Sequence, residues 1–169
     1  MADPAPSSPS ASRPRALDTI LIGGLIAGIL DGLDAILFYR WAFAVPPDTL
    51  FQSIASGLFG RHSFQMGWTS VLIGVLCHFT IAIGAAAVFY AASLRLTFLF
   101  ERPFVFGPAF GICVYLVMHY VVRPLSAVPP RTVPVTHIEL ANLLFAHLFF
   151  VGLPVALMAR KSARTSNGA

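Results

Sequence analysis

Charge is the first thing that this sequence has little of. Only 11% of its 169 residues are Asp, Glu, Lys or Arg, whereas ordinary soluble domains carry about 25%. Hydrophobic residues make up 57% of the chain, and its mean hydropathy is +0.78. This apolar excess is too large for a water-soluble core of this length. The composition therefore excludes an ordinary soluble protein, and the length predicts one compact unit.

Recognisable chemical motifs are also scarce. The +4 net charge comes from basic residues that stand singly beside apolar segments, so we expect no nucleic-acid partner. Cys77 and Cys113 form no C-x-x-C pair and should pack as small hydrophobic residues. No Gly-rich phosphate loop, G-x-S-x-G, H-x-x-x-H or H-E-x-x-H pattern occurs. The sequence thus gives no reason to expect a cofactor or a metal, and it favours a protein that is not an enzyme.

What the sequence does contain is four long apolar stretches. Crossing the hydrocarbon core of a bilayer takes about 20 residues of helix, and each stretch is of about that length. Helices are expected because an open strand in lipid would leave its backbone groups unpaired. We therefore predict an all-α integral membrane bundle of four transmembrane helices within residues 16–160. The stretches are residues 17–38, 68–92, 104–122 and 139–159.

The ends of the chain and its basic residues predict the topology. Residues 1–15 are rich in Pro, Ser and Ala, which predicts a disordered tail. The next stretch is too long for a signal peptide and lacks an A-x-A-like cleavage site. With the N-terminus inside, seven basic residues fall on the cytoplasmic side and four outside. The positive-inside rule then predicts a bacterial inner-membrane protein with both termini cytoplasmic and residues 161–169 as a C-terminal tail.

The first outer loop predicts a short interfacial helix. Pro46 and Pro47 end the first stretch, residues 49–52 fit a capping box, and Gly60 can terminate the helix. The segment is too short to span, so we expect it at the outer interface, either as a gate or as a cover for exposed helix ends. Its apolar side comprises Leu50, Phe51, Ile54, Leu58 and Phe59, and its polar side Gln52, Ser53 and Ser56.

Glycine spacing predicts how the helices pack. Small residues four apart align on one helix face and let two backbones approach closely in a membrane. We therefore expect close helix contacts at two sets of glycines. The first set is Gly24, Gly28 and Gly32, and the second is Gly107 and Gly111. Val71, by contrast, should face lipid.

Beyond the first turn of each predicted span lie two Asp and three His residues, and such groups are costly in a membrane and usually face the bundle interior. Counted from the predicted outer helix ends, Asp31, His78 and His147 lie at depths that agree to within about 5 Å. One carboxylate and two imidazoles at one depth could hold a proton, a cation or a metal ion. Alternatively, Asp31 makes a structural bond to one histidine or to backbone. The full candidate cluster is Asp31, Asp34, His78, His119 and His147.

Glu139 has a simpler interpretation. With Thr136 it fits a second capping box, at the start of the fourth helix. That structural role accounts for Glu139 without any chemistry.

Four stretches resemble a set of small bacterial membrane proteins. They are the glycine-rich segment 23–28, the loop segment 51–60, the helix exit 123–127, and the last helix from Ala146-His147 to Gly152-Leu153-Pro154. A more distant similarity is to the YagU-like inner-membrane family, whose last helix also begins from a Gly/Ala-His pair. The resemblance covers most of the chain after the tail. It implies location and topology and carries no catalytic residues over to this chain.

Two functions follow as hypotheses. The first is a multi-pass inner-membrane protein that acts as a structural or partner-binding subunit, as a homo-oligomer or with another membrane protein in the bilayer. The alternative is a small transporter or channel for protons, cations or metal ions that uses the Asp/His cluster in the outer half of the membrane.

Overall fold

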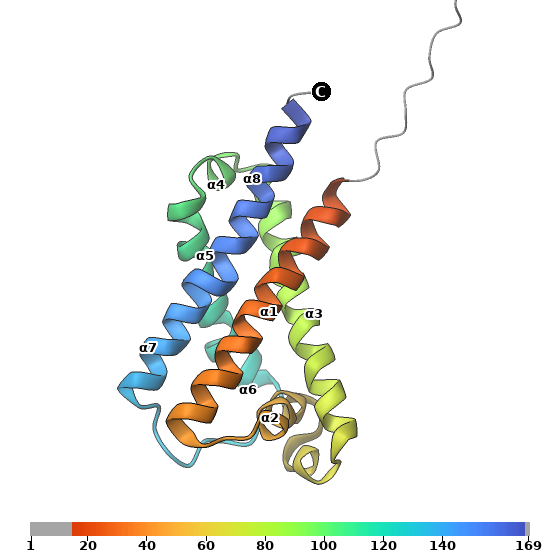
Figure 1. Cartoon of the computed structure of the whole chain (residues 1–169), viewed down its shortest axis with the longest axis vertical. Helices are drawn as coiled ribbons and strands as arrows, with labels where there is room; N and C mark the ends of the chain where they lie inside the picture. The colour runs from red at the N-terminus through yellow and green to blue at the C-terminus, as the bar shows by residue number, and fades with distance from the viewer. Residues whose placement is uncertain (1–14, 168–169) are drawn as a thin grey trace, which may run out of the picture.

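The protein is described from a computed structural model, in which residues 15–167 are placed (Figure 1). The predicted tail lies outside the described residues, apart from Arg15. Helices account for nearly all of the described chain, which contains no strand. In chain order the elements are α1 (Arg15–Phe43), α2 (Pro47–Phe59), η1 (Gly60–Gln65), α3 (Trp68–Ser93), α4 (Phe98–Glu101), α5 (Pro103–Val117), η2 (Met118–Val122), α6 (Arg123–Leu125), α7 (His137–Ala146), η3 (His147–Gly152) and α8 (Leu153–Asn167).

Four helical runs are long and apolar enough to cross a membrane, and we call them the four spans. The first two belong to α1 and α3. In the third, a π-helical segment (η2) joins α5 to α6, and in the fourth another (η3) joins α7 to α8. The four predicted stretches are thereby confirmed as helices, although α1 continues five residues further than expected. The spans are Ala16–Phe43, Trp68–Ser93, Pro103–Leu125 and His137–Arg164.

The spans pack in an order that differs from their order in the chain. α1 contacts α3 on one side and η3 and α8 on the other, and α5 packs against η3 and α8. The third and first spans therefore lie on either side of the fourth, and α3 packs mainly against α1, with a smaller contact to α8 (Figure 1). The start of α1 and the end of α8 lie at one end of the bundle, and α2 lies at the other. We call these the terminal end and the α2 end.

Glycines set the spacing between these helices. A Cβ on Gly24 would lie 2.5 Å from the Ile83 Cα of α3, and one on Gly28 would lie 2.8 Å from the Phe79 ring. On α5, a Cβ on Gly107 would lie 2.9 Å from the Leu153 Cα. Contacts this close are open only to glycine, so larger residues at these positions would push the helices apart.

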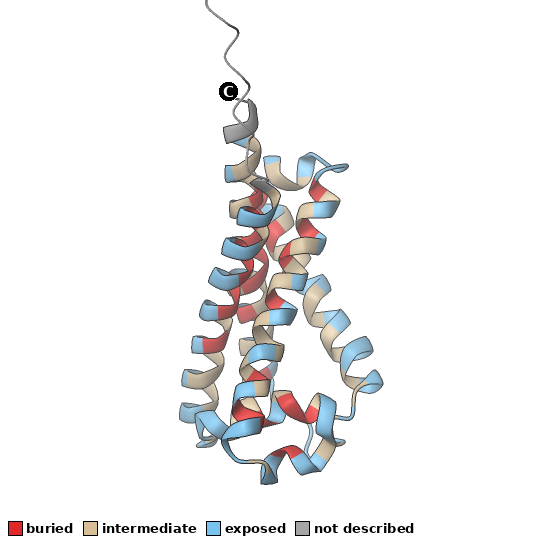
Figure 2. Cartoon of the chain, turned by 90° about the vertical axis from the view of Figure 1, so that its right-hand side faces the viewer, coloured by how far each residue is buried: buried red, intermediate tan, exposed pale blue. Residues whose placement is uncertain are grey.

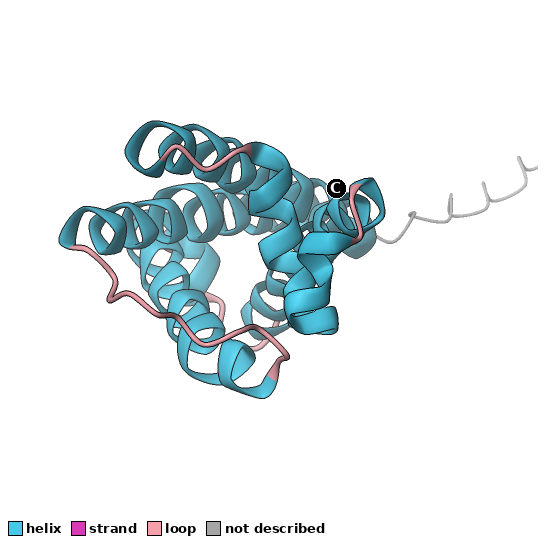
Figure 3. Cartoon of the chain, turned by 90° about the horizontal axis from the view of Figure 1, so that it is seen from below, coloured by secondary structure: helices cyan, strands magenta, loops and turns pink. Residues whose placement is uncertain are grey.

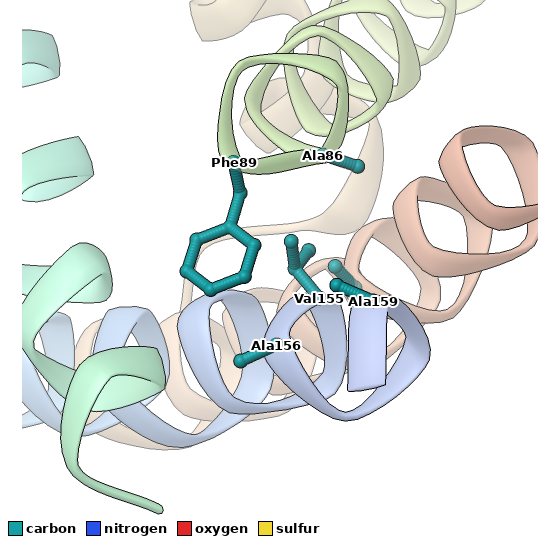
Figure 4. Packing of buried hydrophobic residues seen from close by; sticks show 6 residues of the cluster. Ala86, Phe89, Val155, Ala156 and Ala159 are labelled. Carbon is teal, nitrogen blue, oxygen red and sulfur yellow. The ribbon is translucent and has the colours of Figure 1, made fainter. Parts of the chain in front are cut away.

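The apolar core lies toward the terminal end. Small residues of α1, α3 and α8 surround the Phe89 ring, which points from α3 toward α8 (Figure 4). The cluster is Ala27, Ala86, Phe89, Val155, Ala156 and Ala159. Elsewhere the buried residues follow the inner sides of the helices, while the outer sides carry exposed apolar residues (Figure 2). Such surfaces suit contact with lipid or with other helices.

The structure corrects the predicted start of the loop helix. α2 begins at Pro47, and its N-cap residue, Pro46, makes no side-chain capping bond. Thr49 instead directs its backbone N–H to the Asp48 carboxylate at 2.7 Å, so the capping box at residues 49–52 does not form. Proline at the first helical position is already fixed at helical φ and lacks an N–H that needs a partner, so it starts the helix by itself. The predicted end at Gly60, which has φ +58°, is correct.

Two of the three residues on the polar side of α2 face the protein, whereas Ser53 is exposed. Gln52 and Ser56 are buried, whereas Leu58 and Phe59 are exposed. The Gln52 side chain donates a hydrogen bond to the Gly67 carbonyl at 3.2 Å. The α2 backbone lies directly against Gly74 of α3 at Phe51. Because α2 covers the first turns of α3, Val71 is buried and does not face outward as predicted.

Candidate functional site

His78 bonds to backbone. Its Nε2–H donates to the Gly28 carbonyl of α1 at 2.8 Å, since a carbonyl oxygen can only accept. The absence of a side chain at Gly32 gives the ring its space, because a Cβ there would lie 3.2 Å from Nε2. His78 therefore sits on the glycine face of α1 and holds α1 and α3 in register.

Asp34 has a partner that the sequence did not single out. The Asn142 side chain donates a hydrogen bond to the Asp34 Oδ2 at 2.8 Å and so joins α1 to α7. A carboxylate accepts strongly from an amide N–H, which offsets part of the cost of removing the charge from water. Asp34 thus contacts α7, whereas His78 contacts α1 from α3.

Tyr115 of α5 lies between the other two histidines. Its ring stacks on His119 with centroids 5.6 Å apart, and it meets the edge of His147 at the same distance. The His147 Nδ1–H donates to the Leu143 carbonyl of its own helix at 2.8 Å. His119 lies within the π-helical segment η2, and His147 is the first residue of η3. These two histidines are therefore neighbours of the same aromatic ring.

Asp31 differs from the other four residues. It lies one helical turn beyond the fully buried Ala27, on the inner side of α1, and is itself half-buried. Within the described chain it makes no hydrogen bond, ion pair or ring contact. No group of three or more His, Cys, Asp and Glu side chains among residues 15–167 lies close enough together to hold a metal ion. The five candidates are thus distributed over several separate contacts.

The most extensive polar contact of the bundle centres on Glu139, at the α2 end. The Glu139 side chain is 1% exposed. Its carboxylate accepts hydrogen bonds from both terminal nitrogens of Arg131, at 2.7 and 2.9 Å. The Tyr39 hydroxyl of α1 donates to the same carboxylate at 2.9 Å. We call Tyr39, Arg131 and Glu139 the Glu139 network. It joins the end of α1, the loop before α7 and the first turn of α7.

The predicted capping box at residues 136–139 forms only in half. The Thr136 hydroxyl accepts from the Glu139 backbone N–H at 3.3 Å, as expected. The Glu139 side chain, however, turns to Arg131 and Tyr39, because a two-pronged guanidinium contact is stronger than a bond to one neutral N–H. The pKa of Arg131 is raised by its hydrogen bonds to Glu139. Glu139 is therefore more than a helix cap.

Sequence reasoning missed this network for a specific reason. Arg131 is one of the four basic residues that the sequence places outside, where it counts only as a topology signal, and Tyr39 gives no signal. The one available signal was an acidic residue in the first turn of an apolar span, where a buried charge requires a partner.

No known protein family matches this chain, and no curated protein or solved structure matches it either. These comparisons do not test the resemblance to small bacterial membrane proteins or to the YagU-like family, which stays a prediction. The function must be argued from the residues themselves.

Proposed function

We propose that this chain is a multi-pass membrane protein that acts as a subunit and associates with a second copy of itself through one face of α3. Its four apolar spans support the membrane location. α3 supports the association, because it turns exposed apolar residues such as Leu76 and Val88 outward.

Gly84 is the observation that carries the proposal. A Cβ there would meet nothing within 4 Å, whereas every other glycine within the four spans lies against a neighbouring helix. Thr80, Ala87 and Ala91 lie on the same side of α3, and so does the exposed Val88, four residues after Gly84. An exposed glycine inside a helix costs about 0.5–1 kcal/mol relative to alanine. A second α3 packed against the face around Gly84 would offset that cost.

Disulfide crosslinking in native membranes tests the association. In a background with Cys77→Ala and Cys113→Ala, the Ala87→Cys variant should form a covalent dimer on mild oxidation, since two facing residues would come within disulfide reach. Leu72→Cys is the matched control, because Leu72 is 63% exposed on α3 but lies on another side. Adding Gly84→Leu to Ala87→Cys should abolish the dimer, because the bulky side chain would separate the helices. Equal crosslinking at both positions, or none at either, would contradict the proposal.

A second candidate is transport of protons or small cations, and Asp31 favours it. An ionisable group on the inner side of a span with no partner in the described chain is unusual unless it has a function. The separate partners of Asp34, His78 and His147 favour structural roles for those residues. Proton and cation flux in liposomes, compared between wild type and Asp31→Asn, decides this candidate. If the wild type shows flux and Asp31→Asn abolishes it, transport is supported. If the wild type shows no flux, the subunit role is the only candidate that remains.

We also propose that both termini are cytoplasmic, in a bacterial inner membrane. The seven-to-four distribution of basic residues supports this orientation, and both ends of the described chain lie at the terminal end of the bundle (Figure 1). A reporter fused after Ala169 should read cytoplasmic, and one inserted after Pro130 should read periplasmic. The opposite pattern would reverse the orientation.

In this orientation α2 lies at the outer membrane interface. Its exposed Leu58 and Phe59 would then contact lipid, while its buried Gln52 and Ser56 are held by the protein. This polarity suits a helix that lies along the membrane surface and covers the ends of α1 and α3.

A further inference from the structure

The loop from Ser126 to Thr136 runs across the α2 end of the bundle (Figure 3). Together with η2 and α6 it forms an open pocket of about 560 Å³. Pockets that bind small ligands have volumes of roughly 300–1,000 Å³. The pocket is therefore large enough for a ligand or for the headgroup of a lipid.

The lining of this pocket is cationic. It includes Arg123 and Arg131, and no Asp or Glu is among its described lining residues. Glu139, which does not line the pocket, neutralises the charge of Arg131. Arg123 has no ion pair with any residue of the described chain. The pocket thus contains an unbalanced guanidinium, which favours an anionic ligand.

The second guanidinium is held in a fixed position. Arg131 donates through Nε to the Val133 carbonyl at 3.2 Å and through both terminal nitrogens to Glu139. Five N–H groups belong to a guanidinium, so two remain for a ligand. The loop is anchored to α2, because the Ala127 backbone N–H donates to the Gly57 carbonyl at 2.9 Å. Little conformational entropy would be lost when a ligand binds to such a fixed site.

We propose that this pocket binds a phosphate group, with Arg123 as the principal ligand-binding residue and Arg131 as the second. A phosphate presents several acceptor oxygens, and the planar donor fork of arginine matches two of them at once. Arg123 follows directly after η2, near the end of the third span. A phospholipid headgroup would lie at this level if the chain spans the membrane as proposed, and a soluble phosphate would present the same chemistry.

The test uses the full-length protein in a neutral detergent and has two arms. Native mass spectrometry measures binding of phosphatidylglycerol against diacylglycerol, which lacks the phosphate, and thermal stability measures binding of inorganic phosphate. Arg123→Gln should weaken binding about tenfold, the effect of losing a charge-assisted contact. Arg61→Gln is the matched control, because Arg61 lies in η1 at the same end, is exposed, and does not line the pocket. Arg131→Gln is unsuitable, since it would also break the Glu139 network.

Each outcome decides the proposal. Preference for phosphatidylglycerol alone identifies a lipid headgroup as the ligand, binding of inorganic phosphate alone identifies a soluble ligand, and both together support the shared chemistry. The proposal is overturned if neither probe binds, if Arg123→Gln binds as tightly as wild type, or if Arg61→Gln loses as much affinity. None of these results depends on crosslinking through α3, so the two proposals can fail separately.

Discussion

The Tyr39 hydroxyl donates a hydrogen bond to Glu139 Oε1 at 2.9 Å and so joins residues that are 100 positions apart in the sequence. The contact links the end of α1 to the first turn of α7. Among residues 15–167 it is also the only bond that the carboxylate receives from another span, because Arg131 belongs to the preceding loop. Tyr39 therefore holds the first and fourth spans together at the α2 end, beside the Asn142–Asp34 hydrogen bond.

Tyr39→Phe should destabilise the protein by about 1–3 kcal/mol, because a buried carboxylate loses one of its donors. The substitution keeps the ring and removes only the hydroxyl. Thermal unfolding in detergent is the measurement. Tyr120→Phe provides the comparison, since Tyr120 is 67% exposed and should lose almost nothing. Equal effects of the two changes would mean that the Tyr39 hydroxyl makes no net contribution.

Arg131→Gln should cost more, about 3–5 kcal/mol, because it leaves the buried Glu139 charge without its partner. Adding Glu139→Gln removes that charge and should recover part of the loss, so the two changes should be non-additive. Chemical or thermal unfolding of the two single variants and the double variant gives the coupling. Additive effects would contradict an ion pair. Arg61→Gln, at the same end of the bundle, should change stability by less than about 0.5 kcal/mol.

The spans and the glycine contacts could be predicted from the sequence because both depend on local spacing. About 20 apolar residues suffice to identify a span, and glycines four apart share a helix face wherever that helix goes. Accordingly, Gly28 and Gly107 lie at close helix contacts. Gly152, which faces Gly107 from η3, has no glycine partner at this spacing and could not be identified in the same way.

The polar contacts could not be predicted, for two physical reasons. The Glu139 network depends on the path of the loop before α7 and on the rotation of α1, neither of which follows from helical spacing. The third and fourth spans also contain the π-helical segments η2 and η3. A π-helical turn holds more residues than an α-helical turn, so residues beyond it are rotated to another face. Faces and depths counted at 3.6 residues per turn are therefore inaccurate near His119 and His147.

Gly28→Leu should destabilise the monomer by about 1–3 kcal/mol through overpacking, because Phe79 and Ala82 of α3 already occupy the space around Gly28. Gly84→Leu is the matched control on a glycine without neighbours. Unfolding of the detergent-dispersed monomer should separate the two, with Gly84→Leu close to wild type. If both variants unfold alike, the glycine face of α1 does not limit how closely it approaches α3.

Double-mutant cycles should separate the five candidate residues into contacts and non-contacts. Asp34→Ala and Asn142→Ala should be non-additive, with a coupling of about 0.6 kcal/mol, the average for polar bonds between membrane helices. Asp31→Asn and His78→Gln should be additive within about 0.5 kcal/mol, because His78 bonds to the Gly28 carbonyl and not to Asp31. Unfolding free energies in one detergent supply both cycles. Coupling between Asp31 and His78 would show that the two groups meet in the membrane, and it would strengthen the transport candidate over a purely structural role for His78.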